Sequence, residues 1–267
     1  MTHFIEQSAE LVNQFTNPLK KIEWCARTCT RSRDKITEDS AKEFVSKLWE
    51  LGHGSVFEHA IVKVSFTDYM ELYETQIAYP VGFKDRVIKE TDFVYINARD
   101  YLSIGGTIDK LETLELDTKY SRTVQCTTAI SISRELIRSR DMSYTEESTR
   151  YCAYKDLDLI RPTWMWWAHK MDKDDAKQES QKKLMSNYLD GMDILESKYK
   201  KALELGMKAQ EARELLPLST ATTIVITGTN KQWKHLLELR TSQAAAPGMQ
   251  ELMQKVKSTD EAYFNGL

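Results

Sequence analysis

The sequence predicts a mixed α/β fold of the α+β type, in which a central, mainly antiparallel sheet is flanked by long helices. Residues 221–229 (ATTIVITGT) form the most apolar, β-branched run, which is typical of a buried strand. Residues 174–205 have the character of one or two long charged helices. Ten glycines and five prolines in 267 residues are about half of the usual share of roughly 12%, which favours a helix-rich chain with few tight turns.

The first half of the chain contains helix and strand candidates in alternation. Apolar residues spaced three and four apart predict amphipathic helices over about 4–15 and 40–51. Alternating, β-rich residues predict a strand over 60–69. Two further candidate strands are 92–104 and 123–136, and the second is expected to become helical over its last residues.

The second half predicts the long helical region 174–205, for which Gly206 is a plausible stop. The buried strand 221–229 and a helix over 230–240 follow it. No internal repeat or low-complexity linker divides the chain, so we expect a single domain over residues 1–267.

Composition limits the classes of partner. The chain carries 37 basic and 40 acidic residues, a net charge of −3, so no global field attracts a polyanion and we expect no nucleic-acid partner. No run of about 18 apolar residues occurs, and the first fifteen residues carry acids where a signal peptide would be basic and then apolar. We therefore expect a cytoplasmic protein without a membrane partner.

The four cysteines, Cys25, Cys29, Cys126 and Cys152, form no CxxC pair. Cys25 and Cys29 are four residues apart and would share one helical face, which could suit a metal if other segments supplied two more ligands. Buried free thiols are the favoured interpretation, because no nearby histidine pair completes such a site, and no metal is expected.

Residues 138–151 (RSRDMSYTEESTRY) concentrate anion-binding groups at the end of an apolar run. Arg138 and Arg140 are two apart, as are Ser148 and Arg150, and arginine forks with a neighbouring serine suit a phosphate. The pattern favours a phosphorylated ligand. The alternative is a solvated surface turn held by salt bridges to Asp141, Glu146 and Glu147.

Residues 51–60 (LGHGSVFEHA) place His53, Glu58 and His59 around two apolar residues. Glu58 and His59 are adjacent and would diverge on a helix or a strand, so a polar pocket wall is favoured over a metal site. The alternative is a helix-to-strand junction with satisfied histidines. Farther on, Arg240 ends an apolar helix and Arg213 lies on a helix that Pro217 terminates, and neither means much alone.

Taken together, these segments resemble the flavin-dependent thymidylate synthases. RSRDMSYTEESTRY matches that family's signature, and HGSVFEHA matches its upstream His-x-Ser/Thr-x-Phe-Glu-His segment. ARELLP and LELR, before a segment ending in Ala-Pro, match its C-terminal elements in the right order. The signature positions that fit are Arg138, Arg140, Ser143, Glu146, Ser148, Arg150 and Tyr151.

The resemblance implies a homotetramer that binds FAD and dUMP, with NADPH and methylenetetrahydrofolate as co-substrates. Its sites would draw on several chains, so their residues need not meet within one subunit. The residues implied for FAD are His53, Ser55, Glu58, Arg138, Ser139, Arg140, Glu146, Thr229, Asn230, Lys231 and His235. Those implied for dUMP are Glu135, Arg138, Glu146, Glu147, Ser148, Thr149, Arg150, Arg213 and Arg240.

The implied reaction is methylation of dUMP at C5 to give dTMP. It requires electron density at C5, which a cysteine nucleophile would supply in the other class of thymidylate synthase. The resemblance implies no such nucleophile here. Arg240, facing the pyrimidine ring, would instead stabilise charge on N3 and the neighbouring carbonyls, and it is the candidate catalytic residue.

Three departures from the family pattern lie on the expected flavin side. Ser139 replaces a histidine, Thr229 stands where asparagine is usual, and Ala246 falls in a segment that lacks a common histidine. On the nucleotide side, Glu135 stands where many members have glutamine. Two alternatives therefore stay open: C5 hydroxymethylation, or a related modification, of a deoxypyrimidine monophosphate, and a nucleotide-binding homologue without catalysis.

Overall fold

The computed structural model describes residues 3–74, 87–154, 156–165 and 175–267. One four-stranded sheet has the order β2-β7-β10-β8, a second has the order β4-β5-β3-β6, and both are antiparallel. A separate parallel pair joins β1 to β9. The expected mixed class with mainly antiparallel pairing is confirmed, with the strands divided between two larger sheets. The strands are β1 His3–Ile5, β2 Ser8–Leu11, β3 Ile61–Ser65, β4 Ile88–Lys89, β5 Phe93–Asn97, β6 Glu115–Leu116, β7 Ser121–Ala129, β8 Ser143–Glu146, β9 Asp158–Ile160 and β10 Ala221–Thr229.

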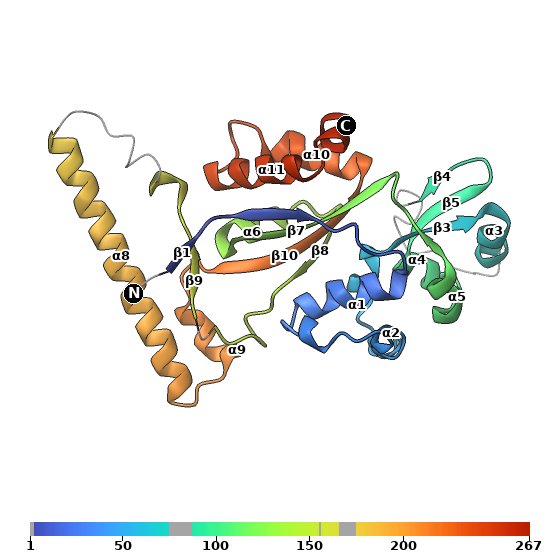
Figure 1. The fold of residues 1–267 in the computed structure, drawn as a ribbon, viewed down its shortest axis with the longest axis horizontal. Helices are drawn as coiled ribbons and strands as arrows, with labels where there is room; N and C mark the ends of the chain where they lie inside the picture. Colours follow the sequence, from blue (N-terminus) through green and yellow to red (C-terminus); the bar gives the residue numbers. More distant parts are fainter. Residues whose placement is uncertain (1–2, 75–86, 155, 166–174) are drawn as a thin grey trace.

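Helices surround both sheets (Figure 1). The helices and 3-10 turns (η) of the N-terminal half are α1 Pro18–Thr28, η1 Arg33–Lys35, α2 Ser40–Glu50, η2 Gly54–His59, α3 Phe66–Glu74, α4 Ala98–Ser103, α5 Ile108–Thr113 and α6 Ile130–Leu136. Those of the C-terminal half are α8 Asp175–Glu204, α9 Ala209–Ala212, η4 Arg213–Leu215, α10 Asn230–Arg240, α11 Pro247–Thr259 and α12 Glu261–Asn265.

The central strands β7 and β10 pair along their whole length, from Ala221 opposite Ala129 to Thr229 opposite Ser121. Because side chains alternate along a strand, Ile224 and Ile226 point to the face covered by α10 and α11, where both are fully buried. Burial of each isoleucine contributes about 1.5 to 3 kcal/mol. Thr227 points to the other face, toward η2. The first sheet thus has one apolar face and one partly polar face.

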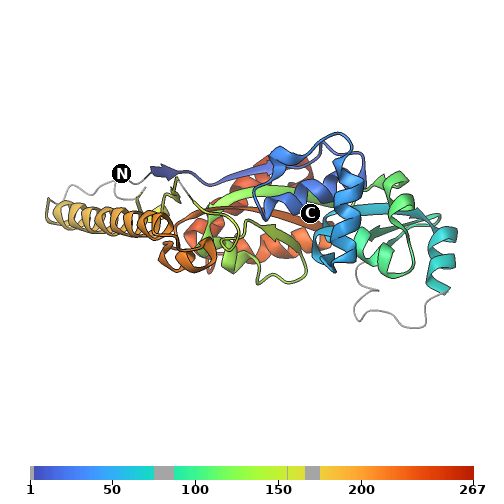
Figure 2. The same cartoon turned by 90° about the horizontal axis from the view of Figure 1, so that it is seen from below.

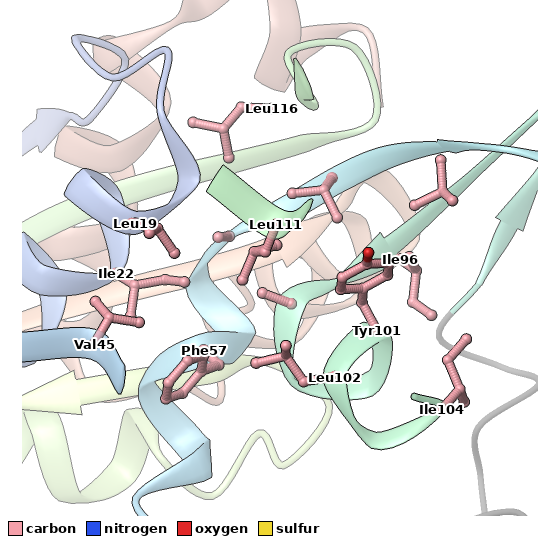
Figure 3. Packing of buried hydrophobic residues seen from close by; sticks show 14 of the residues in the cluster. Leu19, Ile22, Val45, Phe57, Ile96, Tyr101, Leu102, Ile104, Leu111 and Leu116 are labelled. Atoms are coloured by element: carbon pink, nitrogen blue, oxygen red, sulfur yellow. The ribbon is translucent and has the colours of Figure 1, made fainter. Parts of the chain in front are cut away.

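A second core lies where β3 and β5 pack against α1, α2, α4 and α5 (Figure 3). Phe57 from η2 is fully buried in this cluster and meets the ring of Trp49 edge-on, with 5.2 Å between ring centroids. This packing anchors η2 between the two sheets, which is the position from which its polar residues reach the first sheet.

The long helix α8 lies at the end of the molecule opposite the second sheet (Figures 1 and 2). It is a single helix, and Gly206 follows it with φ of +92°, a left-handed conformation that glycine adopts without strain. The predicted helix over 174–205 is confirmed for its described residues, as is the stop. In the described part of the chain, no helix is long and apolar enough to cross a membrane.

The predicted helix over residues 4–15 is wrong, because the described residues of this segment form β1 and β2 instead. Ser8–Leu11 pair with Val124–Thr127 at the edge of the first sheet, and Leu11 packs against the cluster beneath α11. About twelve residues are a marginal length for a helix, so tertiary pairing with β7 decides the conformation.

The remaining predicted elements occur. In some of them, a helix begins within the range that was predicted as a strand. Helices 40–51 and 230–240 and strand 221–229 are confirmed. The strand expected over 60–69 ends at Ser65, whose hydroxyl accepts a hydrogen bond from the amide of Asp68 and starts α3. The other two candidates, 92–104 and 123–136, are each a strand followed at once by a helix, α4 and α6.

Candidate functional site

A cavity of about 650 Å³ opens where η2, β8, β10 and the start of α10 meet. Several residues predicted for the flavin side contribute to its wall, from three separate segments of the chain. Its lining residues are Glu58, Ile61, Asn97, Arg140, Asp141, Met142, Ser143, Thr227, Gly228, Thr229, Lys231, Gln232 and His235. Charged groups of both signs therefore face a space large enough for a sizeable ligand.

A second cavity of about 360 Å³ adjoins the first and shares Arg140 through Met142, Gln232 and His235 with it. It adds Arg138, Ser139, Leu236 and Leu239 to the wall. The structure thus brings Arg138, Ser139 and Arg140 beside Thr229, Lys231 and His235, six residues that the resemblance assigns to the flavin. Because they share five lining residues, the two spaces make up one candidate site, the paired cavity.

Glu58 and its neighbour His59 point in different directions, as their adjacency predicted. Glu58 lines the paired cavity, where its carboxylate accepts hydrogen bonds from Arg99 Nη1 at 2.5 Å and Ser143 Oγ at 3.0 Å. Ser143 starts β8, so this contact ties η2 to the first sheet. Glu58 therefore forms the polar pocket wall that the sequence suggested.

His59 is fully buried, and both of its ring nitrogens have threonine partners. Nδ1 lies 2.8 Å from Thr227 Oγ1, and Nε2 lies 2.9 Å from Thr145 Oγ1. Burial, reinforced by the nearby charge of Lys21, lowers the pKa of His59 to about 3. His59 is thus a neutral, satisfied core histidine, which is the alternative that the sequence left open for this segment.

Of the salt bridges proposed as the alternative for residues 138–151, the described residues contain one, at Glu147, and it does not involve the arginines of this segment. Glu146 accepts hydrogen bonds from Ser133 Oγ at 2.7 Å and Thr222 Oγ1 at 3.0 Å, and Glu147 pairs with Arg31 at 2.7 Å. Arg138 and Arg140 are exposed, and neither forms an ion pair with a carboxylate among the described residues. Their charges remain available to a ligand.

Glu146 faces inward from the last position of β8. Burial raises the pKa of its carboxyl above the ordinary value, and the two hydroxyl donors from Ser133 and Thr222 offset part of that rise. Because these donors come from α6 and β10, Glu146 holds the helix after β7 against the sheet. This contact fixes the base of the turn that carries Arg138 and Arg140.

Arg240, the candidate catalytic residue, reaches the same turn from the last position of α10. Its Nη2 donates to the Glu135 carbonyl at 2.6 Å and lies 3.4 Å from Ser139 Oγ. Its Nε is buried and has no hydrogen-bond partner among the described residues. An unsatisfied buried donor costs about 1 to 3 kcal/mol, and a ligand acceptor would relieve that cost.

Other predicted residues do not line the paired cavity. His53 and Ser55 are exposed on or beside η2, and Asn230 accepts a hydrogen bond from Tyr263 at 2.6 Å. Arg150 and Arg213 are exposed, and no ion pair joins either of them to a described carboxylate. Ser148 and Thr149 precede Arg150 in the loop after β8, where the Ser148 amide donates to the Cys29 carbonyl. The described chain therefore leaves the predicted phosphate-binding residues apart from the flavin-side group.

Sequence reasoning missed several wall residues, among them Asn97, Met142, Gly228 and Gln232. Gly228 carried a usable signal, because a glycine inside a β-branched strand marks a close approach. A Cβ at this position would lie 2.5 Å from the Met142 side chain. Asn97 carried none, since its role as the N-cap of α4 depends on the fold.

The cysteines are free thiols, as expected. Burial raises the pKa of both Cys25 and Cys126 to about 12, which disfavours a thiolate nucleophile. None of the four cysteines lines the paired cavity. Within the described residues, no group of three or more metal-ligating side chains is arranged to hold a metal ion.

Comparison with known proteins gives consistent matches. The family model of the thymidylate synthase complementing protein matches residues 10–73 and 119–261. A probable flavin-dependent thymidylate synthase of Paramecium bursaria Chlorella virus 1 is 32% identical over 45% of this chain and 56% of its own length. The enzyme of Mycobacterium bovis is 32% identical over 43% of this chain and 47% of its own length. The chain thus spans about half the length of these curated relatives.

Two other matches cover most of the chain at lower identity. The flavin-dependent thymidylate synthase of Pyrococcus abyssi is 25% identical over 92% of this chain and 75% of its own length. A crystal structure of a UMP/dUMP methylase from Streptomyces cacaoi, bound with 5-Br dUMP, is 18% identical, with a TM-score of 0.47 over 96% of this chain and 90% of its own.

Proposed function

The chain belongs to the thymidylate synthase complementing protein family, the flavin-dependent thymidylate synthases, and from this premise we propose that it methylates dUMP at C5 to give dTMP. In this proposal methylenetetrahydrofolate supplies the carbon, NADPH supplies the reducing equivalents, and FAD is the cofactor. The observation that carries the proposal is the gathering of Glu58, Arg138, Ser139 and Arg140 with the start of α10 around the paired cavity.

The residues present suit a flavin with a diphosphate group. Arg140 and Lys231 supply positive charge, and the N-terminus of α10 lies at the wall through Thr229 and Gln232. The absence of a side chain at Gly228 lets the Met142 side chain pack directly against the strand at this wall. When bound, FAD would supply hydride and methylene transfer.

Arg240 would act on the pyrimidine ring. Its guanidinium is held by the Glu135 carbonyl, so little conformational entropy is lost when its free Nε meets an acceptor. The fixed positive charge would stabilise negative charge developing on N3 and the neighbouring carbonyls of the uracil ring. Since the buried thiols are disfavoured as nucleophiles, this electrostatic role replaces covalent activation.

Arg150 and Arg213 would bind the dUMP phosphate. Their exposure and lack of acidic partners among the described residues suit a site that is completed when several chains assemble, which supports the proposed homotetramer. A fork of two guanidinium groups matches a phosphate dianion.

The decisive experiment combines the absorbance spectrum of the purified protein, with and without added FAD, with turnover of dUMP under reducing conditions. Production of dTMP supports the proposal, whereas a product carrying a hydroxymethyl group would support the alternative chemistry. Binding of dUMP without any turnover in the presence of FAD, NADPH and methylenetetrahydrofolate would favour a non-catalytic homologue.

The phosphate site has its own test. Arg150→Ala and Arg213→Ala should each weaken dUMP binding in calorimetry by about 1.5 to 3 kcal/mol, the range for hydrogen bonds to charged groups. Lys198→Ala removes an exposed cation from α8 and is the matched control, for which affinity should not change. Unchanged affinity in both arginine variants would reject this assignment.

A further inference from the structure

A third cavity, of about 340 Å³, lies apart from the paired cavity and shares no lining residue with it. It is enclosed by the end of β2 and the loop after it, by α1, by the segment between β6 and β7, and by Asp260 before α12. Its lining residues are Leu11, Val12, Asn13, Phe15, Lys21, Leu116, Asp117, Thr118, Ser121, Arg122, Thr123 and Asp260.

Lys21 is the unusual member of this wall. Its side chain belongs to α1, is only 7% exposed and borders the cavity. Among the described residues, no acceptor lies within hydrogen-bonding or ion-pair distance of its amino group. An ammonium group on a largely buried side chain without a protein partner is costly unless water or a ligand in the adjoining cavity compensates its charge.

The other charges of this cavity are already compensated. Asp117 accepts hydrogen bonds from the amides of Lys119 and Tyr120, both at 3.0 Å, and from Ser121 Oγ at 2.5 Å. Asp260 pairs with Arg122 Nε at 2.8 Å. Lys21 is thus the one lining cation that lacks a partner among the described residues.

Arg122 is fully engaged as well, since its Nη1 donates to the carbonyls of Thr118 and Ser121 at 2.7 and 2.9 Å. Its guanidinium also lies 3.9 Å from the centre of the Tyr263 ring. Arg122 therefore cannot turn toward a ligand without breaking several contacts, which leaves Lys21 as the binding cation.

The remaining wall is half apolar, and its polar members are Asn13, Thr118, Ser121 and Thr123. Leu11, Val12, Phe15 and Leu116 provide a hydrophobic surface beside the amino group. The volume lies at the small end of the range for ligand pockets, roughly 300 to 1,000 Å³. A wall with a continuous set of apolar side chains and one unpaired cation matches a small molecule that has an apolar body and one negative charge.

We propose that this third cavity binds a small organic monocarboxylate, with the carboxylate on the amino group of Lys21 and the apolar body against Phe15 and Leu116. Neither the family nor the proposed reaction assigns a ligand to this place. A phosphate dianion fits less well, because a single cation would face two negative charges and no other free cation lines the described wall.

The electrostatics of the unliganded cavity agree with this assignment. Burial lowers the pKa of Lys21, while the neighbouring Cys25 on the same helix and Asp117 oppose this only in part. His59, the other titratable group near the amino group, remains neutral and supplies no charge. A bound carboxylate would supply the missing negative charge and favour the protonated amine.

Calorimetric titration of the full chain with sodium benzoate tests the proposal. We expect saturable binding that weakens at least tenfold in Lys21→Met, which keeps the length of the side chain without its charge. Lys20→Met is the matched control, because Lys20 is the preceding residue on the same helix, is more exposed and pairs with Glu38. The affinity of Lys20→Met for benzoate should equal that of the parent chain.

Unaltered benzoate binding in Lys21→Met, or no saturable binding to the parent chain, would overturn the proposal. Inorganic phosphate that binds as tightly as benzoate would overturn the monocarboxylate class. If Lys21→Met fails to fold, reductive methylation of the parent chain followed by peptide mass spectrometry replaces it. Benzoate should then slow methylation of Lys21 and not of Lys20, and equal rates for Lys21 with and without benzoate would refute the site.

Discussion

The buried histidine between the two sheets should make the stability of this protein depend on pH. His59 joins η2 to β8 and β10 through Thr145 and Thr227, and its pKa in the folded chain is about 3 instead of 6.5. The folded state therefore keeps the ring neutral where the unfolded chain takes up a proton. The contribution of His59 is fully present above about pH 6.5 and is lost as the pH falls from there toward about 3.

The size of this effect follows from the linkage of protons to folding. Each pH unit below the unfolded pKa costs about 1.36 kcal/mol for one such group, so about 2 kcal/mol is lost by about pH 5. Replacing His59 with leucine removes the titration but leaves the Thr145 hydroxyl without its buried partner. That loss should cost roughly 1 to 3 kcal/mol at about pH 8.

Urea unfolding of the parent chain and of His59→Leu at about pH 8 and about pH 5 measures the proton linkage and the lost hydrogen bond. The free energy of unfolding of the parent chain minus that of His59→Leu should fall by about 2 kcal/mol at the lower pH, because only the parent chain carries this proton linkage. His53→Leu changes an exposed histidine six residues away and is the control. The difference in free energy of unfolding between the parent chain and this variant should be the same at both pH values. A difference for His59→Leu that does not change with pH would refute the assignment of a buried neutral ring.

Three further changes probe the paired cavity and the contacts of the neighbouring turn with Arg240 and Glu146. Arg240→Lys keeps a positive charge but loses the planar fork, so turnover should fall far more than dUMP affinity, and equal losses would make Arg240 only a binding residue. Ser139→His restores an aromatic surface worth about 1 kcal/mol at roughly 25 cal/mol per Å², so it should tighten FAD binding in a fluorescence titration; unchanged affinity would mean that the wall is built around serine. Glu146→Gln keeps an acceptor for Ser133 and Thr222 and removes a carboxyl whose pKa is raised by burial. Because of that raised pKa, the parent chain loses stability as the pH rises through the carboxyl range. In urea unfolding, Glu146→Gln should therefore gain stability relative to the parent between about pH 4 and pH 8. A difference in free energy of unfolding that stays constant over this range would contradict the raised pKa.

Local sequence patterns predicted the elements whose conformation local forces decide. The strand 221–229 was found because its β-branched residues favour a strand locally, and the structure shows that Thr229 caps the helix 230–240 that was expected after it. The segment 4–15 was misassigned because its apolar spacing fits a helix, whereas its backbone pairs with β7, more than a hundred residues away in sequence. Such pairing leaves no local signal.

The candidate site was predictable where a motif carries its residues and unpredictable where only the fold does. Arg138 and Arg140 were found by their spacing, and the structure places them at one wall. Asn97 and Gln232 reach the same space from elements whose sequence positions give no hint of that neighbourhood. Motif spacing predicts side chains that act on a ligand. The positions of side chains that only complete the wall depend on how the elements pack.

The distribution of partners within residues 138–151 separates structural from ligand-binding roles. Glu146 and Glu147 are both committed, one to hydroxyls of α6 and β10 and the other to Arg31. Arg138 and Arg140 before them and Arg150 after them keep no acidic partner among the described residues, although Asp141 lies in the same turn. A purely structural turn would gain a little stability by pairing these charges, about 0.2 to 1 kcal/mol for each exposed pair. The acids of this segment therefore hold the turn in place, and the arginines are left for an anion.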